Sequence, residues 1–205
     1  MTPKLNVATI PPIYGETYKK GYIGFVNWDT SVMSLGIAFF TGWDLMTEIH
    51  ATHALIVTGE NSCVEADAQG NCVKTSALKP YFDNPNCLIF FRKPFDLTEA
   101  TATSIAELAL SAVGCKYDFG AILAQAISGS QIGSFYDRLS RGAMGNTLAN
   151  ILEDPDRWVC SELAAYVLDQ QSKYKDLGIL KYANAAISPQ ELFQDLEIFD
   201  AWRKG

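Results

Sequence analysis

The chain has little of several features that mark large functional classes. Its 205 residues include only two histidines, His50 and His53, and the charged residues amount to 19% with a formal net charge of −7. No block rich in Lys and Arg occurs, and an acidic chain without such a block is poorly suited to nucleic acid or to an anionic membrane surface. The longest apolar run, residues 32–40, is too short to cross a bilayer. We therefore expect no nucleic-acid partner and no transmembrane segment.

The cysteines are also few and irregularly spaced. There are five, an odd number, and no C-x-x-C pair occurs among them. This pattern disfavours a zinc ribbon and a thioredoxin-type redox site. A disulfide framework is not expected in a chain this long with so little cysteine. The two histidines form a His-x-x-His pair without an accompanying cluster of carboxylates or histidines, so neither a metal site nor any other cofactor is expected.

The N-terminal residues 1–12 lack the apolar core of a signal peptide. From this we expect a soluble protein that stays in the cytoplasm or is delivered by a non-classical route, for example as a secreted effector or a phage protein. Hydrophobic residues make up 48% of the chain, which is ample for a core. We expect an irregular leader over residues 1–20 and a single domain over residues 21–205.

Strand patterns fill the first half of the chain and helix patterns fill the second. Short apolar runs between turn residues predict strands over residues 22–27, 53–58, 63–66, 72–75 and 87–92, with a loop over 80–85. Capping residues and helical patterns predict helices over residues 31–40, 96–113, 118–126 and 159–170, and one that begins after Ser188. Asp96 is expected to cap the second of these, and residues 128–147 are expected to be irregular. The pattern is typical of an α+β fold with an antiparallel sheet.

Cys160 opens the apolar helix expected over residues 159–170. The N–H groups and the positive dipole end of a helix N-terminus stabilise an anion, so a thiol there tends toward thiolate. A cysteine of low pKa with a distant histidine is the minimum for nucleophilic catalysis. The alternative is a buried structural cysteine, since free cysteine is among the most buried residue types.

His53 and Glu65 are expected to be neighbours across a hairpin. They lie twelve residues apart, with the turn near Gly59 between them, which places them roughly opposite each other on one face of two antiparallel strands. A carboxylate beside an imidazole orients it and stabilises its charged form. The alternative is that Glu65 is a solvated strand residue. Asp67 lies on the same face and would replace Glu65 if the register differed.

Several short segments resemble motifs of the NlpC-type papain-like cysteine hydrolases. Residues 53–60 (HALIVTGE) and 63–66 (CVEA) resemble the family's histidine strand and the strand that carries its polar third residue. Residues 114–120 (GCKYDFG) resemble its Gly-x-x-Tyr segment, and residues 159–163 (VCSEL) resemble its nucleophile helix. The histidine precedes the cysteine here. That order is typical of the circularly permuted branch, which includes YiiX-like proteins and the lecithin retinol acyltransferase group.

The resemblance implies a permuted papain-like fold, in which an antiparallel sheet with the His53 strand packs against the helix that bears Cys160. It implies that Cys160 is the nucleophile, His53 the general base and then acid, and Glu65 the orienting group. The backbone N–H of Cys160 would supply one oxyanion donor. The hydroxyl of Tyr117 would supply another, or Tyr117 is simply an aromatic residue packed at a helix start.

Three functions are compatible with these residues. The first is a cysteine hydrolase that cleaves an amide bond, in a cell-wall peptide or another short peptide, through a thioester on Cys160. The second is a lipid acyltransferase or thioesterase that uses the same three residues. The third is a binding module without turnover, which the intact Cys, His and Glu set disfavours. The expected partner is accordingly a small peptide or acyl substrate.

Overall fold

The computed structural model describes residues 12–28, 51–117, 157–182 and 187–200. Within these residues the strands form a seven-stranded sheet with the order β5-β1-β2-β3-β4-β6-β7. All neighbouring strands run antiparallel except β6 and β7, which are parallel. The strands are β1 (Ile23–Trp28), β2 (His53–Gly59), β3 (Ser62–Asp67), β4 (Cys72–Ala77), β5 (Cys87–Arg92), β6 (Lys116–Tyr117) and β7 (Arg157–Trp158).

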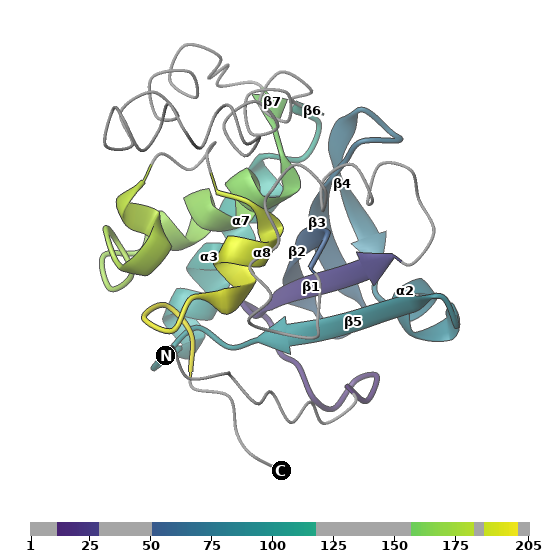
Figure 1. Ribbon diagram of the computed structural model, residues 1–205, viewed down its shortest axis with the longest axis horizontal. Coiled ribbons are helices and arrows are strands. Elements are labelled where there is room, and N and C mark those ends of the chain that lie inside the picture. Colours follow the sequence, from purple (N-terminus) through teal and green to yellow (C-terminus); the bar gives the residue numbers. More distant parts are fainter. Residues whose placement is uncertain (1–11, 29–50, 118–156, 183–186, 201–205) are drawn as a thin grey trace, which may run out of the picture.

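Three helices gather on one side of this sheet (Figure 1). They are α3 (Glu99–Ser111), α7 (Cys160–Asp169) and α8 (Pro189–Gln194). Both α3 and α7 contact β2, α3 also packs against α7, and α7 contacts β3 and α8. A short helix, α2 (Lys79–Asp83), contacts β5, and a 3-10 turn, η1 (Gly178–Lys181), follows α7. The fold is therefore α+β with a largely antiparallel sheet, as predicted.

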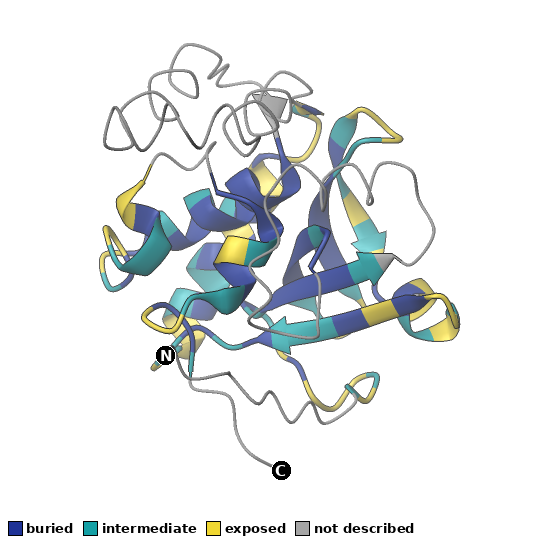
Figure 2. Ribbon diagram, viewed as in Figure 1, coloured by how far each residue is buried: buried dark blue, intermediate teal, exposed yellow. Residues whose placement is uncertain are grey.

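The sheet separates two apolar clusters, because side chains alternate between its faces. Ile56 of β2 and Val64 of β3 belong to the larger cluster, which includes the buried side of α7. Their neighbours Val57 and Cys63 belong to the smaller cluster, together with Leu78, Tyr81 and Tyr18. Figure 2 shows the burial of α7 and of the central strands. The sheet is thus covered on both faces, and a side chain's position along its strand decides which cluster it enters.

Two local predictions are wrong. The expected cap Asp96 has a positive φ of 47°, and the helix starts two residues later, with Thr98 as the cap and its hydroxyl accepting from the backbone N–H of Thr101 at 3.2 Å. Residues 80–85 were expected to form a loop, but α2 includes Lys79–Asp83. Pro80 stands in the first turn of α2, where its missing N–H costs no intrahelical hydrogen bond.

The C-terminal segment is tied to the sheet by Arg92, the last residue of β5. Its side chain is 2% exposed, and its guanidinium donates to the backbone carbonyls of Phe193, Asp195 (3.1 Å) and Asp200 (3.2 Å). The guanidinium also lies over the ring of Phe199, 4.8 Å from its centroid. These contacts satisfy carbonyls at and after the end of α8, where the helix itself leaves them without partners.

Most of the other predicted elements are present within a few residues of their expected bounds. The strands near residues 22–27, 53–58, 63–66, 72–75 and 87–92, the helix at Cys160 and the Ser188 cap of α8 are all confirmed. The strands β6 and β7 and the turn η1 were not predicted. The expected helices over 31–40 and 118–126, the irregular stretch over 128–147 and His50 lie outside the described residues.

Candidate active site

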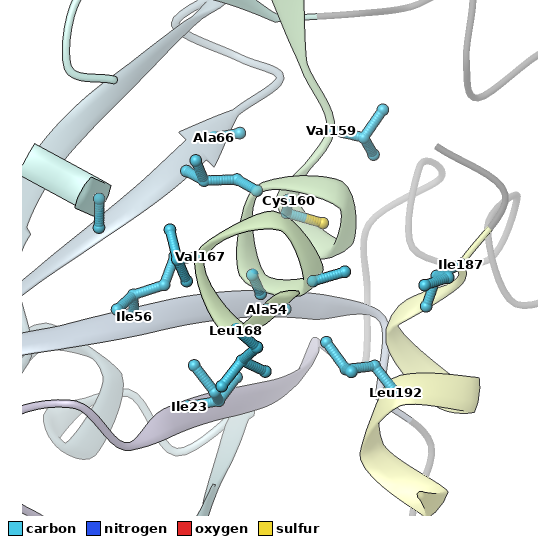
Figure 3. Close-up of a cluster of buried hydrophobic side chains, with 14 of the residues drawn as sticks. Ile23, Ala54, Ile56, Ala66, Val159, Cys160, Val167, Leu168, Ile187 and Leu192 are labelled. Carbon is cyan, nitrogen blue, oxygen red and sulfur yellow. The ribbon is translucent and has the colours of Figure 1, made fainter. Parts of the chain in front are cut away.

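Cys160 is the first residue of α7, as predicted, and is 1% exposed. Val159 before it has an extended backbone (φ −94°, ψ 155°), and the Glu162 carboxylate accepts a hydrogen bond from the Val159 N–H at 3.1 Å. Glu162 thus caps the helix, and its side chain is buried. Figure 3 shows the Cys160 sulfur directed away from Ile56 and Val167, toward the side where Val159 and Ile187 lie.

Tyr117 is brought close to the start of α7 by the parallel pairing of β6 with β7. Tyr117 is the register partner of Trp158, two residues before Cys160. The Tyr117 side chain is 3% exposed and belongs to the same apolar cluster as Cys160. Tyr117 thus stands in strand β6, and the helix expected after it lies outside the described residues. This position keeps it a candidate for contact with the reacting group.

His53 is hydrogen-bonded to Glu65, with 2.7 Å between Nε2 and Oε2. The two side chains share a face of the sheet, as predicted, but they are not directly opposite. β2 contains one extra residue, Thr58, between the pairs Val57↔Cys63 and Gly59↔Ser62. Continuing the register of Ile56↔Val64 sets Leu55 opposite Glu65, so His53 is its diagonal neighbour, which long side chains can still reach.

Glu65 accepts two further hydrogen bonds that the sequence did not indicate. The Ser76 hydroxyl donates to Oε1 at 2.5 Å, and the Tyr81 hydroxyl donates to Oε2 at 2.5 Å. Ser76 comes from β4 and Tyr81 from α2, the segment expected to be a loop. Asp67, the substitute for Glu65, instead binds Lys74 at 2.6 Å. Glu65, and not Asp67, is therefore the carboxylate hydrogen-bonded to His53.

The charges of Cys160, His53 and Glu65 stabilise one another. Burial by itself would raise the pKa of Glu65, but its hydrogen bonds, that from His53 first among them, lower the pKa to about 2. Burial would likewise lower the pKa of His53, but Cys160 and then Glu65 raise it to about 10. Burial raises the pKa of the Cys160 thiol, and the charge and hydrogen bond of His53, helped by the N–H groups of Ala54 and Ser161, lower it overall. The arrangement favours a thiolate, an imidazolium and a carboxylate in a row.

The ring of His53 can serve both neighbours because it has two nitrogens. Nε2 is occupied by Glu65, so Nδ1 is the nitrogen left to interact with Cys160, whose charge raises the pKa of His53. Two other cysteines contrast with Cys160. Burial raises the pKa of the Cys63 thiol, and burial raises that of Cys87 to about 11.

No group of three or more His, Cys, Asp or Glu side chains that could hold a metal ion occurs in the part of the chain that the structure describes. In the same part, none of the helices has the length and apolar character needed to cross a membrane.

A comparison with protein-family models gives no match, and a search of curated proteins gives none either.

Proposed function

We propose that this chain is a cysteine hydrolase with a circularly permuted papain-like fold, and that it cleaves an amide bond in a short peptide through a thioester on Cys160. The observation that carries the proposal is the row of three groups: Cys160 at a helix N-terminus, His53, whose charge lowers the pKa of that thiol, and Glu65, which is hydrogen-bonded to Nε2 of the ring at 2.7 Å. A nucleophile, a base in contact with it and a third group that orients the base are the parts that such catalysis requires.

In the first half of the reaction, the Cys160 thiolate attacks the carbonyl carbon of the amide. A C–S bond forms, and the carbonyl π electrons move to the oxygen. The backbone N–H of Cys160, in the first turn of α7, is a candidate donor to that oxyanion, and the Tyr117 hydroxyl is another. His53 then gives its Nδ1 proton to the leaving nitrogen. The C–N bond breaks, and a thioester and a free amine result.

In the second half, water attacks the thioester carbon while neutral His53 takes one of its protons. The C–S bond breaks, and the peptide carboxylic acid leaves. Cys160 returns to the thiolate and His53 to the imidazolium. Glu65 keeps its charge throughout, since its pKa of about 2 is far below that of the imidazole; it orients the ring and stabilises the imidazolium.

The preferred substrate class is a short peptide such as a cell-wall stem peptide, rather than a long lipid acyl chain. A protein that works at an anionic lipid surface usually has a basic cluster, because each basic residue there contributes about 1 kcal/mol. This chain has a net charge of −7 and no such cluster. The binding of a cell-wall peptide or another small soluble substrate does not require such a basic cluster.

The experiment is to incubate the full chain with peptidoglycan fragments and, separately, with phospholipid vesicles, and to analyse both products and covalent adducts by mass spectrometry. We expect new amine and carboxyl ends in the peptide fragments. Cys160→Ala should abolish them, and His53→Ala should lower the rate by about 10²–10⁴-fold, while His50→Ala, the matched control, should not. Acyl chains trapped on Cys160 from vesicles, with no peptide cleavage, would overturn the amide hydrolase in favour of the acyl-transfer alternative.

A further inference from the structure

Two hydroxyl groups outside the proposed catalytic row converge on its carboxylate. Tyr81 of α2 and Ser76 of β4 donate to opposite oxygens of Glu65, each at 2.5 Å. We propose that Tyr81 and Ser76 are positioning residues of the proposed active site, which hold the Glu65 carboxylate ionised and directed at Nε2 of His53. The proposal rests on the proposed function of Cys160, His53 and Glu65 and adds two residues to it.

The donor and acceptor roles follow from the chemistry of the carboxylate. An ionised carboxylate can only accept hydrogen bonds, so each of its partners must donate. Tyr81 therefore points its O–H at Oε2, Ser76 points its O–H at Oε1, and His53 presents Nε2–H to Oε2. That assignment holds a proton on Nε2 and leaves Nδ1 to exchange its proton with Cys160 and the substrate.

The burial of Glu65 explains why one donor would be insufficient. Glu65 is 5% exposed, so water can supply few hydrogen bonds to its carboxylate. A buried carboxylate without hydrogen-bond donors tends to take up a proton. His53 also gives up a proton in the first half reaction and takes one up in the second, so it does not carry the same charge throughout. Two neutral hydroxyls hold the carboxylate in place without cancelling the negative charge that stabilises the imidazolium.

Tyr81 acts at a distance from the reacting atoms. It belongs to the apolar cluster that contains Val57 and Cys63, whereas Cys160 belongs to the cluster on the opposite face of the sheet. Within the described residues, hydrogen bonds join the Tyr81 hydroxyl to Glu65 and Glu65 to His53, the residue whose charge lowers the pKa of the Cys160 thiol. Loss of this hydroxyl should therefore affect the chemical step more than the binding of the peptide.

The structure offers a matched control in Tyr18. It is buried in the same cluster as Tyr81, and its hydroxyl donates to the backbone carbonyl of Glu60 at 2.8 Å. Tyr18→Phe and Tyr81→Phe each remove one hydroxyl from a buried tyrosine of the same apolar cluster. Only the second removes a hydrogen bond to Glu65.

The experiment compares Tyr81→Phe, Ser76→Ala and Tyr18→Phe in the full chain. We expect Tyr81→Phe and Ser76→Ala each to lower kcat for peptide hydrolysis by about tenfold, the scale of one hydrogen bond to a charged group, with KM unchanged. Titration by carboxyl ¹³C NMR should show a higher Glu65 pKa in both. Tyr18→Phe should match the wild type in kcat and in the Glu65 titration.

A second comparison separates positioning from a general loss of stability. In a Glu65→Ala background, Tyr81→Phe should cause no further fall in kcat, because its effect passes through Glu65; a fall that persists there would overturn the proposal. The carboxyl titration needs no substrate. If no peptide is cleaved by the wild type, the proposed function fails. If the titration of Glu65 is the same in all three variants, the positioning role fails, whatever the substrate.

Discussion

Substitution of Glu65 by Gln removes the carboxylate charge while keeping the size and one acceptor oxygen of the side chain. The pKa of Glu65 is about 2, against about 4.5 for an ordinary glutamate. That difference corresponds to about 3 kcal/mol of preferential stabilisation of the ionised form in the folded protein. At pH 6, where Glu65 is charged in both the folded and the unfolded chain, Glu65→Gln should lower the free energy of unfolding by up to about 3 kcal/mol.

The sign of the pH dependence follows from the direction of each pKa change. The pKa of Glu65 is depressed, so its contribution is present above about pH 4.5 and is lost as the pH falls through about 2. The pKa of His53 is raised from 6.5 to about 10, so its contribution is present below pH 6.5 and is lost as the pH rises through about 10. The difference between wild type and Glu65→Gln should therefore be largest between pH 4.5 and 6.5 and nearly vanish at pH 2.

Urea unfolding followed by circular dichroism at several pH values measures this difference directly. Glu99→Gln is the control, because the Glu99 side chain is 84% exposed and its ion pair with Lys20 lies at the surface, where such pairs stabilise little. A destabilisation by Glu65→Gln that stays the same from pH 6 to pH 2 would refute the reasoning. It would mean that shape or packing, rather than the carboxylate charge, is what the substitution disturbs.

Two further predictions concern the thiols and the C-terminal segment. Alkylation by iodoacetamide at pH 6 with mass-spectrometric mapping should label Cys160 first, because a thiol such as Cys87 with a pKa of about 11 is ionised to only about 10⁻⁵ at that pH; preferential labelling of another cysteine would contradict the assignment. Arg92→Met should lower the free energy of unfolding by more than about 2 kcal/mol, because it leaves the carbonyls of Phe193, Asp195 and Asp200 without their charged donor. An unchanged urea midpoint would show that these carbonyls find other partners.

The strands and α7 could be predicted because their signals are local. The short apolar runs of β2 and β3 predict strands, and successive side chains of a strand point to opposite faces whatever the rest of the chain does. The apolar run after Cys160 and the Ser188–Glu191 capping box are contained within a few residues. For the same reason the face shared by His53 and Glu65 was predictable from a separation of twelve residues.

The register of that hairpin was less predictable. The extra residue Thr58 changes which residues stand opposite each other, and nothing in the local pattern distinguishes a bulge there from a regular strand. The His53–Glu65 contact survives because Leu55, the residue opposite Glu65, is two residues from His53, and a difference of two keeps the side chains on the same face. The helix cap at Thr98 was missed for a similar reason: Asp96 and Thr98 are both good capping residues, and the ion pair of Asp96 with Lys173 is a tertiary contact.

The sequence by itself determined the α+β class, the strand faces, and a thiol at a helix start with a histidine and a glutamate on one hairpin face, because each depends on residues close together in the chain. Only the tertiary structure decided that Cys160 meets His53, since they lie far apart in the sequence and are joined by the packing of α7 on β2. It also decided that Tyr81 and Ser76 converge on Glu65. Such convergence depends on how a strand and a helix pack in space, which no local pattern of residues encodes.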